Sequence, residues 1–495
     1  MTPTPRNEDV HRTHPTARRL FWVTAIVASV IHWIPHFPPQ IDLSQHAAQI
    51  RLLHDFLSGR DFAFRNILAL NFFTPYLPAY LAGAALTAVV PAVIVVKLLW
   101  TMAALGTVYA GVRLRRVLGS GDKIDWLMLP GLFGITFQWG FLTFFFALPF
   151  GIFVVELWVR HLRREQRRTG VLVALALVAL FFAHSLVAAW AMSVCAAMLL
   201  TSARTPVEML RRTTKLLPLL SPLPVAILWL GRTRHLDQTQ ALTTWDWTTR
   251  YFAFFSYWLG IADRWLALAA GITLLAALVA NGARLSRDPV SLAPFLVTML
   301  MLLAGPNMLY GNAMTYNRFF SLLGPALVWA LAGGATKPAR SRIRQSALPL
   351  IAGACVVLFG IRMVRFAREQ DNFTRVLGVM SPGQRTLSVV QEARSAALDN
   401  KRAYLHFPVW YQAERGGLVE PSFAAYVPMI VRFRRPGDAG APFEFESRPG
   451  IAAVPQLARF KYMLVRSPTM VAPKLSAHGL GLVAHEGQWW LFARP

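Results

Sequence analysis

The chain has 495 residues, of which 55% are hydrophobic and only 15% are charged. Soluble proteins average roughly 45–50% apolar and about 25% charged residues, so the composition excludes an ordinary water-soluble enzyme. The apolar residues form long blocks of membrane-spanning length, which predicts a polytopic membrane protein. Both cysteines, Cys195 and Cys355, lie inside apolar blocks, which excludes a disulfide framework and a cysteine-based metal site.

The net charge of +26 is concentrated in short connections beside the apolar blocks. Six such segments hold 23 of the 50 lysines and arginines: residues 1–19, 113–123, 160–168, 203–215, 284–288 and 336–346. Positive residues in short loops mark the cytoplasmic side of a membrane protein. We therefore attribute the basic charge to membrane topology and expect no nucleic-acid partner.

The N-terminal region predicts one crossing followed by an external loop. Residues 1–19 form a cytoplasmic tail, and a helix over residues 20–34 leaves the cytoplasm. Pro35-His36-Phe37-Pro38 lacks the small residues of a signal-peptide cleavage site, so this helix is retained. Residues 36–71 then lie outside. Apolar residues at 43, 47, 50, 53 and 57 predict an amphipathic helix lying on the membrane surface.

The rest of the transmembrane domain, which we place at residues 20–362, follows from the basic loops. Residues 72–112 predict one full crossing plus a re-entrant or surface helix. Residues 124–159 predict a hairpin of two helices with its bend near Trp139 and Gly140, and residues 170–202 predict a tight hairpin with its bend near His184. Single crossings follow at about 215–231, 264–282, 290–305, 319–335 and 347–362. The expected total of about 11 transmembrane helices places the two termini on opposite sides.

The C-terminal tail, residues 363–495, is predicted to lie outside as a small domain. Strand-like runs at Tyr462–Val465 and Trp489–Phe492 accompany helical patches at 386–398 and 472–478. The expected fold class is therefore an α-helical polytopic membrane protein with a small C-terminal external α/β domain.

Ionisable residues are scarce inside the predicted helices, where Lys97, Glu156 and Arg362 are the exceptions. Ion-coupled transporters keep such residues near the middle of the membrane. The scarcity favours a reaction site at the outer surface, with a lipid or polysaccharide transporter and a non-catalytic membrane scaffold as the alternatives.

The first external loop carries the pair Asp42 and His46, whose four-residue spacing places both on one face of the predicted helix. The spacing alone leaves two interpretations open. In the first, Asp42 caps the helix and His46 is solvated. In the second, the carboxylate is available for chemistry at the membrane surface.

A wider pattern surrounds this pair. A long first helix is followed by an external loop with an acidic residue, a surface helix, and the Pro/Tyr-rich segment Pro75-Tyr76-Leu77-Pro78-Ala79-Tyr80. Trp139-Gly140-Phe141-Leu142-Thr143-Phe144 and Phe182-Ala183-His184 occur later in the chain. Together these features resemble the GT-C superfamily of membrane glycosyltransferases, and uncharacterised bacterial members in particular. The resemblance covers the whole chain.

The resemblance implies a bacterial inner-membrane enzyme that transfers a sugar from a polyprenyl-phosphate donor to an external glycan or lipid acceptor. Asp42 then matches the acidic residue of the family's first external loop, which acts as general base or orients the acceptor. Arg318 is placed to meet the leaving phosphate, because a guanidinium binds phosphate in a bidentate manner. The alternative for Arg318 is an interfacial anchor whose charged end reaches water.

Further candidates for substrate binding are His46, Arg51, His184, Tyr316, Asp237 and Asp246. His184 either contacts a substrate or is a buried histidine paired with a backbone carbonyl. Asp237 and Asp246 lie in a loop rich in aromatic residues, which either form an interfacial belt or stack against sugar. Loop one has no paired acidic motif and the tail has no Trp-Trp-Asp motif, so we expect no metal, no other cofactor and no peptide acceptor.

Overall fold

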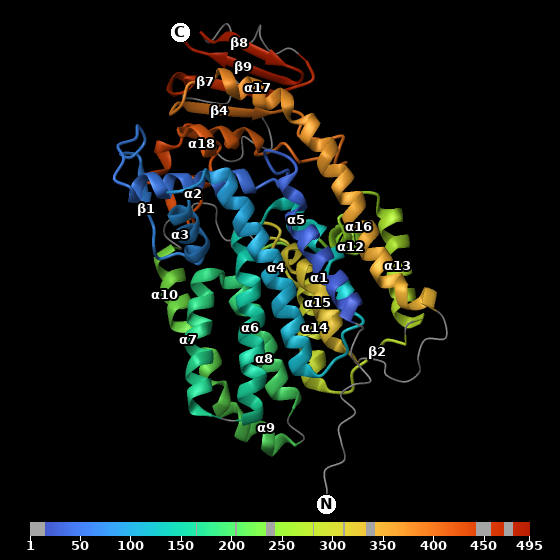
Figure 1. The fold of residues 1–495 in the computed structure, drawn as a ribbon. Helices are drawn as coiled ribbons and strands as arrows, with labels where there is room; N and C mark the ends of the chain where they lie inside the picture. The colour runs from blue at the N-terminus through green and yellow to red at the C-terminus, as the bar shows by residue number, and fades with distance from the viewer. Residues whose placement is uncertain are drawn as a thin grey trace, which may run out of the picture.

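The computed structural model describes residues 15–164, 166–202, 205–233, 243–280, 282–309, 312–332, 342–441, 457–469 and 479–495. Over these residues the chain forms an upright helical bundle that carries a layer of strands at one end (Figure 1). In this view the first helix rises beside α4 toward the strand layer at the upper end, where the C-terminus lies.

The bundle contains long apolar helices and several short ones. Its helices are α1 (Pro15–Val30), α4 (Ala92–Leu118), α6 (Leu142–Arg164), α7 (Arg167–Ala183), α8 (Ser185–Thr201), α9 (Pro206–Arg212), α10 (Leu223–Thr233), α11 (Trp247–Phe252), α12 (Phe254–Leu259), α13 (Arg264–Ala280), α14 (Pro289–Ala304), α15 (Phe320–Ala330) and α16 (Arg342–Glu369). The short strands β2 (Arg284–Leu285) and β3 (Leu331–Ala332) pair antiparallel.

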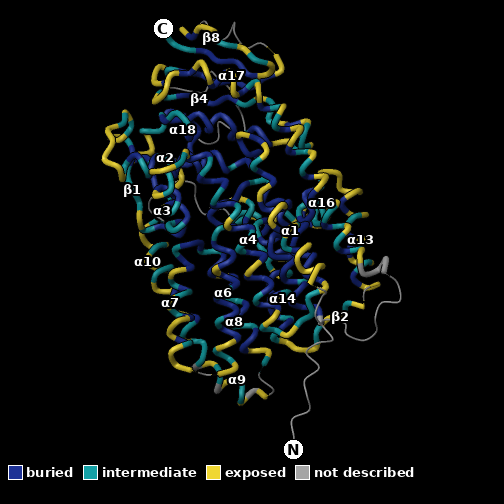
Figure 2. The backbone as a smooth tube through the Cα atoms, in the orientation of Figure 1, coloured by how far each residue is buried: buried dark blue, intermediate teal, exposed yellow. Residues whose placement is uncertain are grey.

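Many residues on the outer faces of the bundle are exposed (Figure 2), and several of them have large apolar side chains. Leu175 on α7, Val279 on α13 and Leu350 on α16 have exposed fractions of 63%, 74% and 68%. Extended apolar surface of this kind is unusual on a soluble monomer and suits contact with lipid. Within the described residues, four helical stretches are long and apolar enough to cross a membrane: Ala92–Leu118, Leu142–Arg164, Lys215–Thr233 and Ser346–Val379.

Residues 72–112 form one short and one long helix. The short helix α3 (Leu77–Leu86) has 10 residues and is about 15 Å long, which is too short to cross a bilayer. The long helix α4 has 27 residues. Lys97 on α4 donates to the carbonyl of Pro35 across 2.8 Å, so this buried cation fixes the start of the first loop.

The predicted hairpin over residues 124–159 is correct in its bend and its second arm but wrong in its first arm. Gly140 adopts the left-handed conformation with φ 75° at the bend, and α6 follows. The first arm, however, consists of two 3₁₀ turns at Asp125–Met128 and Pro130–Phe133 and of the five-residue helix α5 (Ile135–Trp139). Pro130 is unfavourable in a helix interior, and a Cβ on Gly134 would lie 2.5 Å from the carbonyl oxygen of Tyr257, so the backbones touch here.

Residues 170–202 form the two helices α7 and α8, which meet at His184 as the sequence predicts. The structure also explains why α6 can contain the ionisable residue Glu156 near its opposite end. It lies 2.7 Å from Arg113 on α4 and 2.6 Å from Arg160 on its own helix. This buried carboxylate is therefore neutralised by two guanidinium groups.

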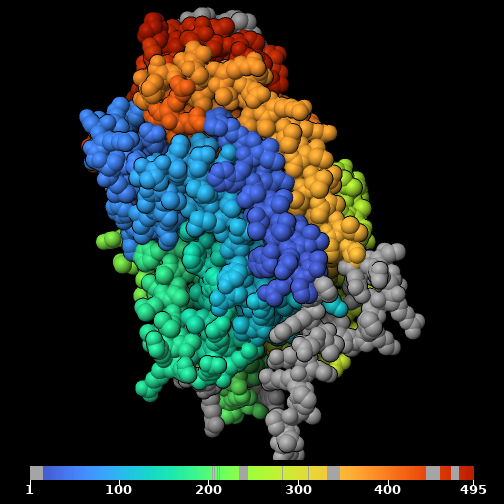
Figure 3. All heavy atoms as spheres, in the orientation of Figure 1, coloured from blue at the N-terminus to red at the C-terminus, as the bar shows by residue number. Residues whose placement is uncertain are grey.

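The first loop contains α2 (Leu43–Leu57) and β1 (Leu68–Leu70). The limits of α2 agree with the apolar spacing, but the helix does not lie exposed on a membrane surface. Most residues of α2 are buried, and they lie on all faces of the helix (Figure 2). The loop lies directly beneath the tail (Figure 3), and β1 pairs antiparallel with β6 (Val431–Phe433) of the tail. The apolar face of α2 packs on the bundle while the polar face contacts the tail.

The tail is built around a five-stranded mixed sheet with the order β5-β4-β7-β9-β8. Its elements are α17 (Asp371–Val379), β4 (Arg385–Val390), α18 (Trp410–Arg415), β5 (Leu418–Glu420), β7 (Tyr462–Arg466), β8 (Gly481–Glu486) and β9 (Trp489–Ala493). Strand β4 runs parallel to β5 and β7, whereas β9 is antiparallel to β7 and β8.

Several details of the predicted tail differ from the structure. The strand-like runs are strands β7 and β9, but residues 386–398 begin with strand β4 instead of a helix, because the run Thr386–Val389 is buried between neighbouring strands. The second helical patch, 472–478, lies outside the described residues. The boundary at residue 363 falls inside α16, which continues from the bundle to the sheet.

Candidate active site

Asp42 is held at the start of α2 by the bend between α5 and α6. The backbone N–H of Asp42 donates to the carbonyl of Trp139 across 2.7 Å, and the N–H of Ile41 donates to Gln138 across 3.1 Å. A Cβ on Gly140 would lie 2.8 Å from the Cβ of Gln40. The Trp-Gly bend therefore needs glycine both for its positive φ and for this close approach.

The side chain of Asp42 makes no capping hydrogen bond to α2, so the capping interpretation is wrong. Instead, Oδ1 of Asp42 lies 3.0 Å from Nδ1 of His406 in the tail. The His406 side chain is 4% exposed and that of Asp42 is 13% exposed. Ser44 donates to the carbonyl of His406 across 2.7 Å, which fixes this part of the tail on α2.

His46 is buried, which overturns the solvated interpretation. Its Nδ1 lies 2.7 Å from the hydroxyl of Tyr80, and its ring packs edge-on against Phe423 of the tail. Burial lowers the pKa of His46 to about 4, the charge of Asp42 opposes this shift, and the charges of Arg318 and His406 add to it. His46 is therefore neutral at neutral pH.

Arg318 lies in the 3₁₀ turn Tyr316–Phe319 that leads into α15. Its guanidinium carbon lies 4.1 Å from the ring centroid of Phe141, and Nη2 donates to the carbonyl of Ala313 across 3.3 Å. Burial lowers the pKa of Arg318, while the nearby Tyr76 and Asp42 oppose the shift. Arg318 is thus half-buried beside the bend and within electrostatic reach of Asp42.

His184 ends α7 and caps α8. Its Nδ1 accepts the backbone N–H of Leu186 across 3.3 Å, so it is not paired with a backbone carbonyl through that atom. The ring lies between Tyr76 and Phe144, with centroid distances of 5.1 and 5.2 Å, and the charge of Arg318 reaches it. The structure therefore brings His184 into the same region as Asp42.

Three of the other candidates lie elsewhere. Arg51 is nine residues beyond Asp42, on the opposite face of α2, where its Nε lies 3.0 Å from Asp55. Tyr316 is buried and its ring centroid lies 4.1 Å from the guanidinium carbon of Arg250. Asp246 caps α11 by accepting the N–H of Thr249 across 3.0 Å. Asp237 lies outside the described residues.

His406, Tyr80 and Arg250 were not among the residues predicted from sequence. Tyr80 falls in the Pro/Tyr-rich segment, which is the signal that points to it. His406 is 364 positions from Asp42, and nothing in the local sequence pattern connects the two. No three potential metal-binding side chains come together within the part of the chain that the structure describes.

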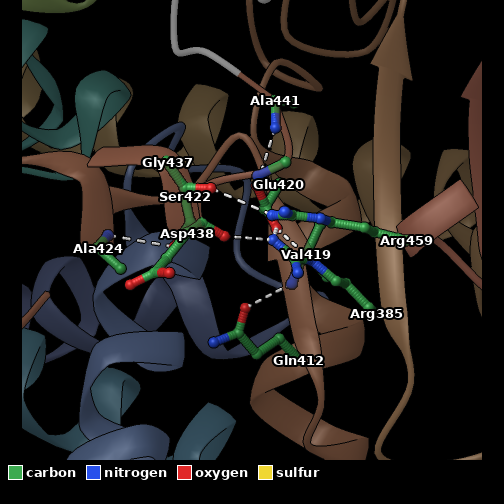
Figure 4. A network of polar contacts seen from close by, with 11 residues as sticks. Arg385, Gln412, Val419, Glu420, Ser422, Ala424, Gly437, Asp438, Ala441 and Arg459 are labelled. Atoms are coloured by element: carbon green, nitrogen blue, oxygen red, sulfur yellow. Dashed lines mark hydrogen bonds and ion pairs between the residues drawn. The ribbon is translucent and has the colours of Figure 1, made fainter. Parts of the chain in front are cut away.

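The tail segment that carries these contacts is itself held by a buried network (Figure 4). Glu420 is fully buried and accepts hydrogen bonds from Arg385 across 2.7 Å and from the N–H of Ala441 across 3.0 Å. Gln412 accepts the N–H of Val419 across 2.9 Å. The next residues, Pro421 and Phe423, bond to α2 through Gln45. The network therefore fixes the strand end from which the tail reaches the helix of Asp42.

Comparison with solved structures shows which proteins share this architecture. ArnT from Cupriavidus metallidurans, bound to undecaprenyl phosphate, matches with a TM-score of 0.57 and 12% identity, over 97% of this chain and 98% of that one. The arabinofuranosyltransferase AftD from Mycobacteria matches with a TM-score of 0.50 and 15% identity, over 96% of this chain. Both are GT-C membrane glycosyltransferases.

The chain shares the fold of ArnT and AftD. It spans 40% of the length of AftD, so AftD has a large additional part. No protein-family model matches the sequence, and no curated protein sequence matches it significantly. At these identities the likeness establishes the fold alone.

Proposed function

We propose that the chain is an inner-membrane glycosyltransferase that moves a sugar from a polyprenyl-phosphate donor to an extracytoplasmic glycan or lipid acceptor. The fold supports this assignment, as does the undecaprenyl phosphate bound to ArnT, which has the same architecture over nearly its whole length. The observation that carries the proposal is the environment of Asp42. Its carboxylate is not used to cap α2 and lies within reach of the charge of Arg318.

In the proposed reaction Asp42 is the catalytic base. The acceptor hydroxyl attacks the anomeric carbon and gives its proton to Asp42 as the new C–O bond forms. The bond between the anomeric carbon and the phosphate oxygen breaks at the same time, and the polyprenyl phosphate leaves with the electron pair. This single displacement inverts the anomeric centre. No step in it requires a metal.

Arg318 and the two buried histidines assist. The leaving phosphate gains negative charge, which the guanidinium of Arg318 stabilises in a partly buried site where electrostatic interactions are strong. His46 and His184 are neutral ring systems that line the same region and position substrate hydroxyls or phosphate oxygens. His406 is a positioning residue, because its contact with Oδ1 orients the carboxylate of Asp42.

The orientation follows from the charges. The basic connections after α4 and α6, together with α9, lie at the end of the bundle opposite the tail (Figure 1). That end faces the cytoplasm under the positive-inside rule. Asp42 and the tail then face the outside, where a lipid-linked donor reaches them from the outer leaflet.

Asp42→Asn tests the proposal directly. In vesicles containing the purified chain and a radiolabelled polyprenyl-phosphate sugar, we expect transfer to fall at least about 100-fold, the effect of removing a general base. Asp55→Asn is the matched control, because Asp55 lies on the same helix but pairs with Arg51, and it should retain activity within about threefold. Unchanged transfer in Asp42→Asn would defeat the assignment, and lipid or glycan flux that persists without transfer would favour a transporter.

A further inference from the structure

A cavity of about 430 Å³ opens at one edge of the tail sheet. Its lining includes Glu369 at the end of α16, Glu392 and Arg394 after β4, and Arg466 and Trp489 at the ends of β7 and β9. None of the side chains that contact Asp42 belongs to this lining. The proposed reaction therefore leaves the cavity without a role.

The position of the cavity in the sheet is one that commonly binds ligands. Strands β4 and β7 are parallel, with Val390 opposite Arg466 at their carboxyl ends. Trp489, the first residue of β9, lies opposite Arg466 on the other side. In open α/β sheets, ligands bind in the crevice outside the carboxyl ends of parallel strands. The cavity lies at that edge.

The charged groups of the cavity are held in place before any ligand binds. Glu369 accepts hydrogen bonds from Ser395 across 2.8 Å and from the N–H of Ala397 across 3.0 Å. Arg466 is only 5% exposed, its guanidinium carbon lies 4.0 Å from the ring centroid of Tyr404, and it donates to the carbonyl of Glu392. Such fixed groups make a preorganised site, which binds without a large ordering cost.

The charge balance of the lining indicates the class of ligand. The lining contains two carboxylates, Glu369 and Glu392, and two guanidinium groups, Arg394 and Arg466, so its formal charges cancel. The carboxylates would repel a phosphate, and the guanidinium groups would repel a metal ion or an ammonium group. A neutral ligand with many hydroxyl groups fits, because each hydroxyl both donates and accepts.

The remaining lining residues support the same ligand. The amide side chains of Asn372 and Gln488 offer donors and acceptors to hydroxyl groups, and Trp489 adds an apolar surface. The volume lies within the range of roughly 300–1,000 Å³ that small-molecule sites occupy. We propose that this cavity binds a neutral sugar residue of the acceptor, which makes the acceptor a neutral glycan. The proposal rests on the proposed function.

The cavity and the candidate active site are joined by one short segment. Arg466 stacks on Tyr404, and the ring of Tyr404 contacts Phe407 with a centroid distance of 4.9 Å, while His406 between them contacts Asp42. A glycan held in the cavity is thereby kept near the reaction site at a high effective concentration. We expect this to lower KM for longer acceptors without changing kcat.

Blocking the cavity mouth tests the proposal. Ala396 is exposed and lines the cavity, so Ala396→Trp fills it. Val483→Trp, on β8 at a position 47% exposed, adds the same side chain elsewhere on the sheet and is the control. The probes are methyl glycosides of glucose, galactose, mannose and arabinose. Binding to the full-length chain in nanodiscs, without donor, is measured by saturation-transfer NMR.

We expect at least one glycoside to bind to the wild-type chain and to Val483→Trp, with a signal at least fivefold weaker in Ala396→Trp. Inorganic phosphate should not displace it. In transfer assays Ala396→Trp should raise KM for oligosaccharide acceptors at least tenfold and leave kcat unchanged. The inference is overturned if no glycoside binds, if Ala396→Trp binds like the control, or if phosphate displaces the sugar. Failure of the proposed function is seen separately, as undiminished transfer in Asp42→Asn.

Discussion

Asp42 occupies a helix N-terminus, where an aspartate ordinarily bonds to the backbone of the first turn. Here the side chain instead turns toward His406 at 3.0 Å, while the backbone of the α5–α6 bend fixes the residue from behind. This contact is attractive when Nδ1 of His406 carries hydrogen, because two lone pairs at this distance would repel each other. The carboxylate is thus oriented by a residue from the far end of the chain.

His406→Ala should lower kcat about 10- to 100-fold, because Asp42 then lacks the contact that orients it. KM for the donor should stay within about twofold, since the proposed role of His406 is to orient Asp42. His406→Gln restores a donor and should recover a substantial part of kcat. Steady-state transfer assays on the three proteins check this. Equal losses in the alanine and glutamine variants would show that His406 acts only through folding.

His46 should make the fold sensitive to acid. Its pKa is about 4 in the folded chain against an ordinary value near 6.5, so the unfolded chain takes up the proton first as the pH falls. The contribution of His46 to the free energy of unfolding is therefore fully present above about pH 6.5. It is lost progressively towards pH 4, and the loss is about 2 kcal/mol at pH 5. Melting temperatures in detergent at pH 7.5 and pH 5.0 measure the loss. His46→Gln should show a smaller drop, and an identical drop would exclude His46 as its source.

The helix α2 connects the bundle to the tail. Its polar side chains, which on sequence alone seem to face water, bond to backbone groups of the tail: Gln45 to Pro421 and Phe423, and Gln49 to the N–H of Val431. Buried backbone groups need such partners. The amphipathic pattern of α2 therefore reflects packing against two protein surfaces, one of the bundle and one of the tail.

Gln45→Leu should weaken this junction, because the buried carbonyl of Pro421 and the N–H of Phe423 both lose their partner. Each unsatisfied group costs about 1–3 kcal/mol, so we expect a clearly lower melting temperature and faster proteolysis of the tail. Gln391→Leu, at an exposed position, is the control. If Gln45→Leu has the same melting temperature and the same protease resistance as Gln391→Leu, the junction does not depend on these bonds.

The elements of the chain were predictable to different degrees. The apolar spacing of α2 predicts its limits, and the Trp139-Gly140 turn predicts the bend that holds Asp42. The burial of α2 was not predictable, since the covering residues lie more than 360 positions away. The 3₁₀ arm before α5 was missed because its apolar composition suits a helix, whereas its conformation follows from close backbone contacts at Gly134.

At the scale of the whole molecule, the basic connections gather at one end of the bundle and the tail sits at the other. The composition and the positions of the basic residues predict this difference between the two ends, and they predict the membrane location. It does not predict the number of crossings, because shorter helices such as α14 and α15 build part of the bundle. The GT-C resemblance rested on the order of short motifs, and the solved structures support it at the level of fold.

Accessibility labelling tests the orientation. Ser58 follows α2 near the tail, whereas Thr201 ends α8 at the opposite end of the bundle, and both are exposed. With Cys195 and Cys355 replaced by alanine, Ser58→Cys should react with an impermeant maleimide in intact spheroplasts. Thr201→Cys should react only after lysis. The reverse pattern would place Asp42 in the cytosol and exclude an external reaction.

The β1–β6 pairing and the contacts of α2 also bear on biosynthesis. Residues 42–49 leave the ribosome early, but the partners that finish their surroundings, from His406 to Val431, emerge more than 350 codons later. Until then Asp42 lacks its orienting neighbour. Under the proposed mechanism, a nascent or prematurely terminated chain lacks the contact that orients the base, so we expect full activity only when synthesis is nearly finished.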